Sequence, residues 1–201
     1  MKTLVLLVLI ALLSGASSYG QDQFIYDQES ANEQTPGGSP ASLLPSEQPV
    51  GQSFVPRLSS VGFIRLSTRD TQMDGFGATL YVMLRTDSIT GPVIASTAPV
   101  ILLDGFNGHV NFTFATPARV TPGTTYYFQP VLESGVNWVV HGYNDYNYPD
   151  GDAYYRGLRQ PGLDLWFREG VVVPEPATLI LSLTGLLTLM NTKPFRTACA
   201  S

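Results

Sequence analysis

The residues best suited to chemistry lie between positions 138 and 155, where aromatic side chains are interspersed with amides and carboxylates. Aromatic ring faces can cover the apolar C–H face of a pyranose, while polar groups beside them bind its hydroxyls. The pattern therefore predicts a carbohydrate-binding region. Its candidate ligand-binding residues are Trp138, Tyr143, Tyr146, Tyr148 and Tyr154. The alternative interpretation is a tyrosine-rich loop that caps one end of the fold, with the tryptophans in the core.

The same stretch also offers hard oxygen ligands. Asp145, Asn147, Asp150 and Asp152 fall within eight residues of one another, and such groups could converge on a calcium ion. The register departs from the EF-hand loop, because Asp150 occupies the position where that loop requires glycine. We therefore expect no cofactor, with calcium as the alternative. The competing interpretation is a hairpin turn at Asp150-Gly151 with exposed carboxylates.

Candidate catalytic groups are sparse. A Ser, Cys or Thr nucleophile needs a base that a third group holds in place, and the chain contains only two histidines, His109 and His141, and no Gly-x-Ser-x-Gly motif. Carboxylates are numerous, but no spacing singles out a pair for glycoside hydrolysis. We predict a protein that is not an enzyme, and we keep a secreted hydrolase as an alternative.

The composition limits the class of partner. The chain has 201 residues, with 11 Lys plus Arg against 16 Asp plus Glu, and a formal net charge of -5. Nucleic-acid binding needs a basic stripe, so nucleic acid is not an expected partner. The single cysteine, Cys199, cannot form an internal disulfide.

The elements that would position these residues are strands. Period-two alternation, typical of a strand with one buried face, occurs at residues 78–85, 110–114, 136–140 and 163–168. Turn-forming pairs separate the runs: Asp74-Gly75, Asp104-Gly105, Asn107-Gly108, Pro122-Gly123 and Asp150-Gly151. We predict an all-β, antiparallel β-sandwich. A short strand at 24–26 precedes a polar stretch at 27–49, which predicts a long loop or flexible arm that Leu43-Leu44 pins to the core.

The N-terminus has the parts of a secretory signal peptide. Lys2 is followed by an apolar run at 4–13 and by small residues up to Gly20, and cleavage after Ala16 or after Gly20 would both suit a signal peptidase. The apolar run is too short to span a bilayer. We therefore predict a signal peptide at 1–20 and an ectodomain at 21–173, whose 15 acids and 8 arginines give a charge of -7.

The C-terminal residues 174–201 combine a Pro-Glu-Pro motif, an apolar stretch at 179–190 and a basic end. The matching residues are Pro174, Glu175, Pro176, Lys193 and Arg196. This arrangement resembles the PEP-CTERM sorting signal of exported bacterial proteins. The resemblance implies a transmembrane segment during transit through the inner membrane, an exosortase-type membrane protease as partner, and delivery to the cell surface or extracellular matrix. The prolines keep the motif extended, and the basic residues stay cytoplasmic.

Residues 51–56, 80–85, 108–117, 121–127 and 164–168 are similar to the strands of exported, jelly-roll-like bacterial β-sandwich modules that often accompany such tails. That resemblance implies a fold and a compartment rather than a reaction. We therefore predict an exported surface or matrix protein with a structural or interaction role, in contact with exopolysaccharide. The first alternative is a carbohydrate-binding module that uses the 138–155 region, and the second is the secreted hydrolase.

Overall fold

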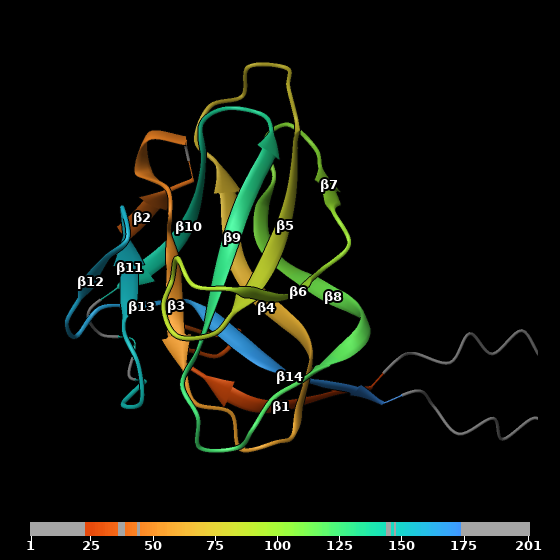
Figure 1. The fold of residues 1–201 in the computed structure, drawn as a ribbon. Helices are drawn as coiled ribbons and strands as arrows, with labels where there is room; N and C mark the ends of the chain where they lie inside the picture. The colour runs from red at the N-terminus through yellow and green to blue at the C-terminus, as the bar shows by residue number, and fades with distance from the viewer. Residues whose placement is uncertain (1–22, 36–38, 44, 144–145, 147, 174–201) are drawn as a thin grey trace, which may run out of the picture. The chain divides into compact units, whose positions relative to one another are not determined.

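The computed structural model describes residues 23–35, 39–43, 45–143, 146 and 148–173 (Figure 1). Almost all of these residues lie in one compact unit, Phe24–Val172, which is built from strands and one short 3-10 turn, η1 (Pro45–Glu47). No helix of membrane-spanning length and apolarity occurs among these residues. The fold is therefore all-β with two antiparallel sheets, as predicted.

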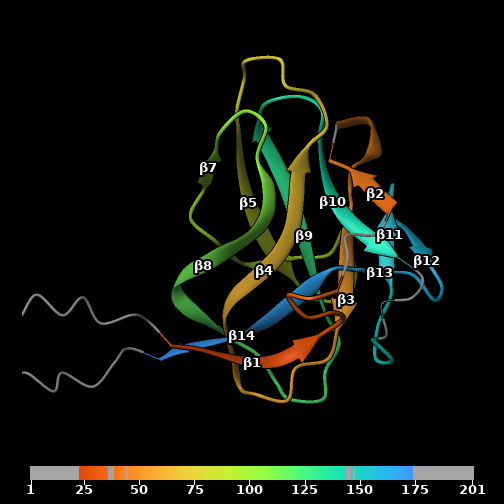
Figure 2. The same cartoon turned by 180° about the vertical axis from the view of Figure 1, so that it is seen from behind.

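The first sheet is organised around β4, which pairs with three other strands. Its strands are β1 (Gln23–Glu29), β2 (Ser39–Ser42), β4 (Ser60–Asp70), β8 (Asn107–Arg119), β10 (Trp138–Tyr143), β13 (Asp164–Leu165) and β14 (Phe167–Val173). Strand β8 pairs along one edge of β4, and β14 and β10 pair with successive parts of the other edge. Strand β1 lies beside β14, whereas β2 and β13 pair with β10 (Figure 2).

The second sheet runs in the order β12-β11-β3-β9-β5-β6, with β7 also paired to β5. Its strands are β3 (Gly51–Phe54), β5 (Ala78–Arg85), β6 (Val93–Ser96), β7 (Val100–Leu102), β9 (Tyr126–Ser134), β11 (Ala153–Tyr155) and β12 (Leu158–Gln160). Because β3 lies between β9 and β11, residues far apart in the sequence share one face of this sheet.

The core lies between the two sheets. Strand β5 alternates buried and half-buried positions along its whole length, which confirms the strand predicted at 78–85. From the first sheet, Phe167 packs against Phe54 and Phe128 of the second, at ring-centroid distances of 6.5 and 5.2 Å. All three rings are fully buried, and burial of such aromatic surfaces is the main source of the sandwich's stability.

Two local predictions were wrong in part. The stretch at 27–49 is not simply a loop, because β1 continues to Glu29 and the stretch also contains β2 and η1. Within it, Leu43 is fully buried, as the prediction of a pinning contact required, while Leu44 lies outside the described residues. The Asn107-Gly108 pair is not a turn: it opens β8 opposite Arg69 and Thr68, since Gly105, at a φ of 72°, has already made the turn.

Candidate functional site

Three of the predicted ligand-binding aromatics have buried rings. Trp138 is fully buried on β10 and stacks on Phe106 at 6.5 Å. Tyr146 and Tyr148 are 4% and 5% exposed, and the Tyr148 hydroxyl accepts a hydrogen bond from the Val55 N–H at 2.8 Å. A sugar cannot stack on these ring faces as they lie here. The prediction was wrong for these three residues because an aromatic residue type indicates an amphipathic side chain but does not show which face of the sheet the ring occupies.

The other two aromatics reach the surface. Tyr143, at the end of β10, is 42% exposed and its ring contacts Tyr146 edge to face at 6.0 Å. Tyr154, on β11, is half-buried in the second sheet. These two residues belong to different sheets. Of the two, Tyr154 lines a polar pocket on the second sheet.

Among the described residues, no group of three or more His, Cys, Asp or Glu side chains is placed to hold a metal ion. Asp145 and Asn147 lie outside those residues, so their part of the prediction stays untested. Asp150 is exposed at the turn. The Asp152 side chain is buried and already paired with a cation of the protein, Arg159.

The strongest candidate site is a polar pocket of about 430 Å³ on the second sheet. It lies where β9, β3 and β11 run side by side, next to the turn that precedes β11. Its lining includes two tyrosine rings, hydroxyls, carboxylates and a guanidinium: Ser53, Thr125, Tyr127, Asp150, Asp152, Tyr154 and Arg159. We call this the tyrosine pocket. Gly151, at its base, must be glycine, because a Cβ there would overlap the Ser53 carbonyl.

A pair of tyrosine rings forms the apolar part of the tyrosine pocket. Tyr127 and Tyr154 meet edge to face, with centroids 5.7 Å apart and an interplanar angle of 75°. Burial raises the pKa of Tyr127, and the neighbouring Tyr154 contributes to the rise. The Tyr127 phenol is therefore uncharged at neutral pH, and a tyrosine hydroxyl of this kind can both donate and accept a hydrogen bond.

Asp152 organises the polar part. Its Oδ2 accepts hydrogen bonds from Arg159 Nε and Nη2 at 2.6 and 2.5 Å, and its Oδ1 accepts one from the Gly162 N–H at 2.9 Å. The Asp152 N–H donates to Ser53 Oγ at 3.0 Å. The two contacts from Arg159 to Asp152 Oδ2 hold the guanidinium at the pocket.

A second buried carboxyl, that of Asp164, stabilises the segments that form the pocket. Asp164 Oδ1 accepts a hydrogen bond from Gln52 Nε2 at 2.7 Å, and Oδ2 accepts one from the Tyr148 N–H at 3.0 Å. Burial raises the pKa of Asp164 to about 6, and the nearby Asp152 charge adds to the rise. Asp164 thereby ties the turn that carries Gly151 to the first sheet.

Sequence reasoning missed Ser53, Thr125, Tyr127 and Arg159. Tyr127 lies at the start of β9, and Thr125 stands two residues before it, just outside the strand, so the spacing of the two residues was a usable signal. Arg159 offered none, because it reaches Asp152 only through the hairpin between β11 and β12, whose turn holds Arg156 and Gly157 at φ values of 54° and 73°.

The histidines lie on the outer face of the first sheet. Ser67 Oγ and His141 Nδ1 are 2.8 Å apart, and both residues are buried. Burial, together with Arg69, lowers the pKa of His141. This is a serine beside a base, but a substrate would have to displace the side chains covering it, among them Trp166.

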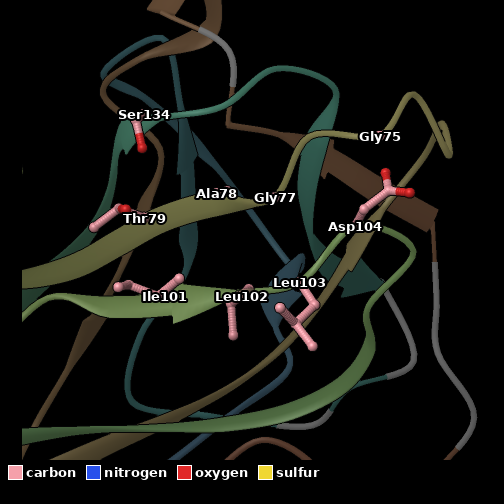
Figure 3. Close-up of a pocket in the computed structure, with 9 residues that line it drawn as sticks. All are labelled: Gly75, Gly77, Ala78, Thr79, Ile101, Leu102, Leu103, Asp104 and Ser134. Carbon is pink, nitrogen blue, oxygen red and sulfur yellow. The ribbon is translucent and has the colours of Figure 1, made fainter.

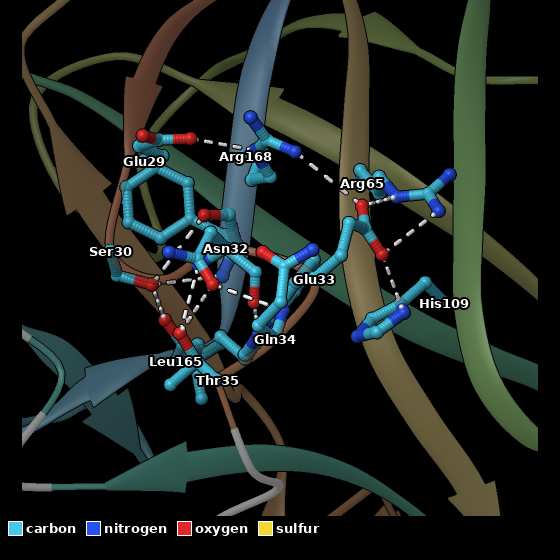
Figure 4. A network of polar contacts seen from close by, with 12 residues as sticks. Glu29, Ser30, Asn32, Glu33, Gln34, Thr35, Arg65, His109, Leu165 and Arg168 are labelled. Atoms are coloured by element: carbon cyan, nitrogen blue, oxygen red, sulfur yellow. Dashed lines mark hydrogen bonds and ion pairs between the residues drawn. The ribbon is translucent and has the colours of Figure 1, made fainter.

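An ion-pair network lies near His109 and links the segment after β1 to the first sheet (Figure 4). Glu33 contacts Arg65 and His109 at 2.8 Å each and Arg168 at 3.5 Å. Burial alone would raise the pKa of Glu33, but Arg65 and the other cations outweigh it and the pKa is lowered. Arg168 also stacks on the Tyr26 ring at 3.4 Å. The network secures the segment after β1 to the sheet.

The five predicted sorting residues, Pro174, Glu175, Pro176, Lys193 and Arg196, lie outside the described residues. In comparisons with known proteins, no protein-family model matches the chain, and no curated protein matches it significantly.

Proposed function

We propose that this protein is an exported bacterial surface or matrix protein, sorted through its C-terminal signal, with a non-catalytic, jelly-roll-like ectodomain. One observation supports it most: the described core residues all lie between Ala31 and Phe167. The described part of the predicted ectodomain thus packs around a sandwich core of its own, which suits a segment that lies between the predicted signal peptide and the predicted sorting signal.

The topology supports the jelly-roll-like assignment. Along the chain, β3, β4, β5, β8, β9 and β10 alternate between the two sheets. Repeated crossing between two packed sheets is the connectivity expected of Greek-key and jelly-roll sandwiches. Such a fold presents strand faces and loop ends to partners, which suits an interaction role.

Replacing Pro174, Glu175 and Pro176 together by Ala is expected to abolish sorting. The wild-type chain should be shortened near Pro176 and exposed at the surface, whereas the variant should keep its full C-terminal mass in the inner membrane. Intact mass and cell fractionation measure both properties. Alanines at Asn191 and Thr192 serve as the control within the same tail. Identical mass and fraction for the wild type and the motif variant would contradict the proposal.

The tyrosine pocket favours a second candidate function, binding of a neutral saccharide. The Tyr127 and Tyr154 rings offer apolar surface, and Asp150, Asp152 and Arg159 offer hydrogen bonds to hydroxyls. Two carboxylates against one guanidinium leave a charge of -1, which disfavours acidic sugars. Exopolysaccharide contact would then be made by the second sheet rather than by Trp138.

Tyr154→Ala is expected to weaken retention of the full chain in dextran or galactomannan affinity gels by about tenfold, because an aromatic contact is worth about 1 kcal/mol beyond its buried area. Tyr127→Ala should act similarly. Tyr143→Ala is the matched control, since this exposed tyrosine lies on the other sheet. Loss of retention in Tyr143→Ala but not in Tyr154→Ala, or equal retention by all variants, would remove the pocket as a saccharide site.

A further inference from the structure

Five large apolar side chains gather at one end of the sandwich and point into solvent. They come from the loop between β4 and β5, from β7 and the loop after it, and from the loop between β9 and β10 (Figure 1). Their exposed fractions range from 50% to 85%. The residues are Met73, Phe76, Ile101, Leu103 and Val136. We call them the apolar tip.

The members of the apolar tip are neighbours in space. A Cβ at Gly105 would lie 3.4 Å from Met73, and a Cβ at Gly77, next to Phe76, would lie 3.4 Å from the Cα of Leu103. A Cβ at Gly135, next to Val136, would likewise lie within 3 Å of Gly77 and Ala78. A pocket of about 510 Å³ opens among these loops, with Ile101 and Leu103 in its lining (Figure 3).

Polar contacts hold together the loops that carry the apolar tip. Thr71 donates to the Asn137 carbonyl from both its N–H, at 2.9 Å, and its Oγ1, at 2.6 Å. The Asp74 N–H donates to Asp104 Oδ1, and the Gly105 N–H to Asp70 Oδ2, both at 3.1 Å. A surface ordered in this way before binding loses little conformational entropy when a partner docks.

These apolar side chains contribute little to the core, and contiguous exposed apolar surface marks interaction sites in soluble proteins. The charge around them selects the partner. The three loops contain Asp74 and Asp104 but no Lys, Arg or His. At the base of the loops, Asp70 and Glu133 outnumber the one cation, Arg69. No described Arg or His forms an ion pair with any of these four carboxylates.

We propose that the apolar tip docks a segment of a partner protein that carries large apolar side chains flanked by Arg or Lys. The apolar side chains would cover Phe76 and Leu103, and the cations would compensate Asp74 and Asp104. A second copy of this chain fits poorly, because a two-fold contact would place the carboxylates against their own counterparts. An anionic bilayer is repelled for the same reason. This role goes beyond surface display and saccharide binding and is independent of both.

The test uses the full chain and two fluorescent synthetic peptides, measured by fluorescence anisotropy. One peptide has Leu and Phe residues flanked by Arg, and the other replaces each Arg by Glu. The Arg peptide should bind saturably and more weakly at higher salt, and the Glu peptide should not bind. Phe76→Ser combined with Leu103→Ser should weaken binding of the Arg peptide at least about tenfold, as expected for central apolar contacts.

Two matched controls separate the apolar tip from general surface effects. Leu158→Ser removes an equally exposed apolar side chain on β12 and should leave binding unchanged. Asp74→Asn with Asp104→Asn keeps both Oδ1 acceptors and should weaken binding severalfold, whereas Asp87→Asn, at another exposed turn, should not. Absence of saturable binding, equal binding of both peptides, or equal loss in Leu158→Ser overturns the proposal. Tip-dependent dimerisation in gel filtration, or tip-dependent binding to phosphatidylglycerol vesicles in place of peptide, also overturns it.

Discussion

Replacing Glu169 by Gln is expected to stabilise the protein by up to about 3 kcal/mol at pH 7, and by more at pH 9. Glu169 faces the interior from β14 and is completely buried, and its carboxyl lies close to the Asp27 side chain and the Gln28 backbone. Burial, followed by the charge of Asp27, raises its pKa from 4.5 to about 9. Gln keeps the shape of the neutral acid and removes the titration.

The sign follows from the two pKa values of Glu169. Below pH 4.5 the carboxyl is neutral in both the folded and the unfolded chain, so it has no pH-dependent effect on stability. As the pH rises from 4.5 toward 9, the unfolded chain releases the proton and the folded chain retains it. The folded state then binds more protons, so its stability falls by about 1.4 kcal/mol for each pH unit.

Chemical denaturation of the wild type and of Glu169→Gln at pH 5, 7 and 9 measures this effect. The difference between the two free energies of unfolding should grow with pH. Asp164, whose raised pKa also makes the wild type less stable as the pH rises from about 4 to about 6, is present in both proteins and cancels. Glu133→Gln, at an exposed position, is the matched control. A constant difference across this pH range would contradict the buried neutral acid.

The strand pattern of the fold was predictable because one face of most strands is buried. Residues 78–85 show it well, since β5 faces the core on one side and half-buried positions on the other. The pattern fails on β10, where residues 138–142 are all buried. The segment after β1 and the Trp166 region cover the outer face there, and a strand covered on both sides shows no alternation.

The candidate site was predictable only in its composition. The sequence placed aromatic and acidic residues in the 138–155 region, and three of the predicted residues, Asp150, Asp152 and Tyr154, do line the tyrosine pocket. Tyr127 and Arg159 come from β9 and β12, which reach the pocket because β3 and β11 lie between them in the sheet. Strand order is set by long-range packing, and no local pattern in the sequence encodes it.

Replacing Trp166 by Ala is expected to cost about 3 to 4 kcal/mol of stability, the range for removing a buried aromatic side chain. Trp166 is 1% exposed and packs with Ala31 and Tyr146 in a small cluster outside the main core. Its ring stacks on His109 at 4.1 Å, and its Nε1 donates to the Asn32 carbonyl at 3.3 Å. The side chain therefore holds the segment after β1 against the outer face of the first sheet.

The same substitution should raise the pKa of His109. Burial, which the Trp166 ring contributes to, is the main cause of the lowered pKa of His109. The Glu33 charge opposes it, and Arg65 and Arg168 reinforce it. A lowered folded pKa means that the wild type loses stability as the pH falls below 6.5 toward that value. Removing the ring should shrink this acid-dependent loss, even though the total stability is lower.

Titration of the imidazole by NMR, together with denaturation at pH 5 and 7, separates the two effects. Trp166→Phe is the matched variant, because it keeps a ring over His109, loses the hydrogen bond to Asn32, worth about 1 kcal/mol, and leaves a smaller cavity than Trp166→Ala. If Trp166→Ala lowered stability without moving the His109 pKa, the ring would act only as a packing element. If Trp166→Phe lost as much stability as Trp166→Ala, the hydrogen bond to Asn32 would be the contact that holds the segment after β1 on the sheet. A large loss confined to Trp166→Ala, with a raised His109 pKa, would instead show that one stacked ring both closes the outer face and keeps the histidine uncharged.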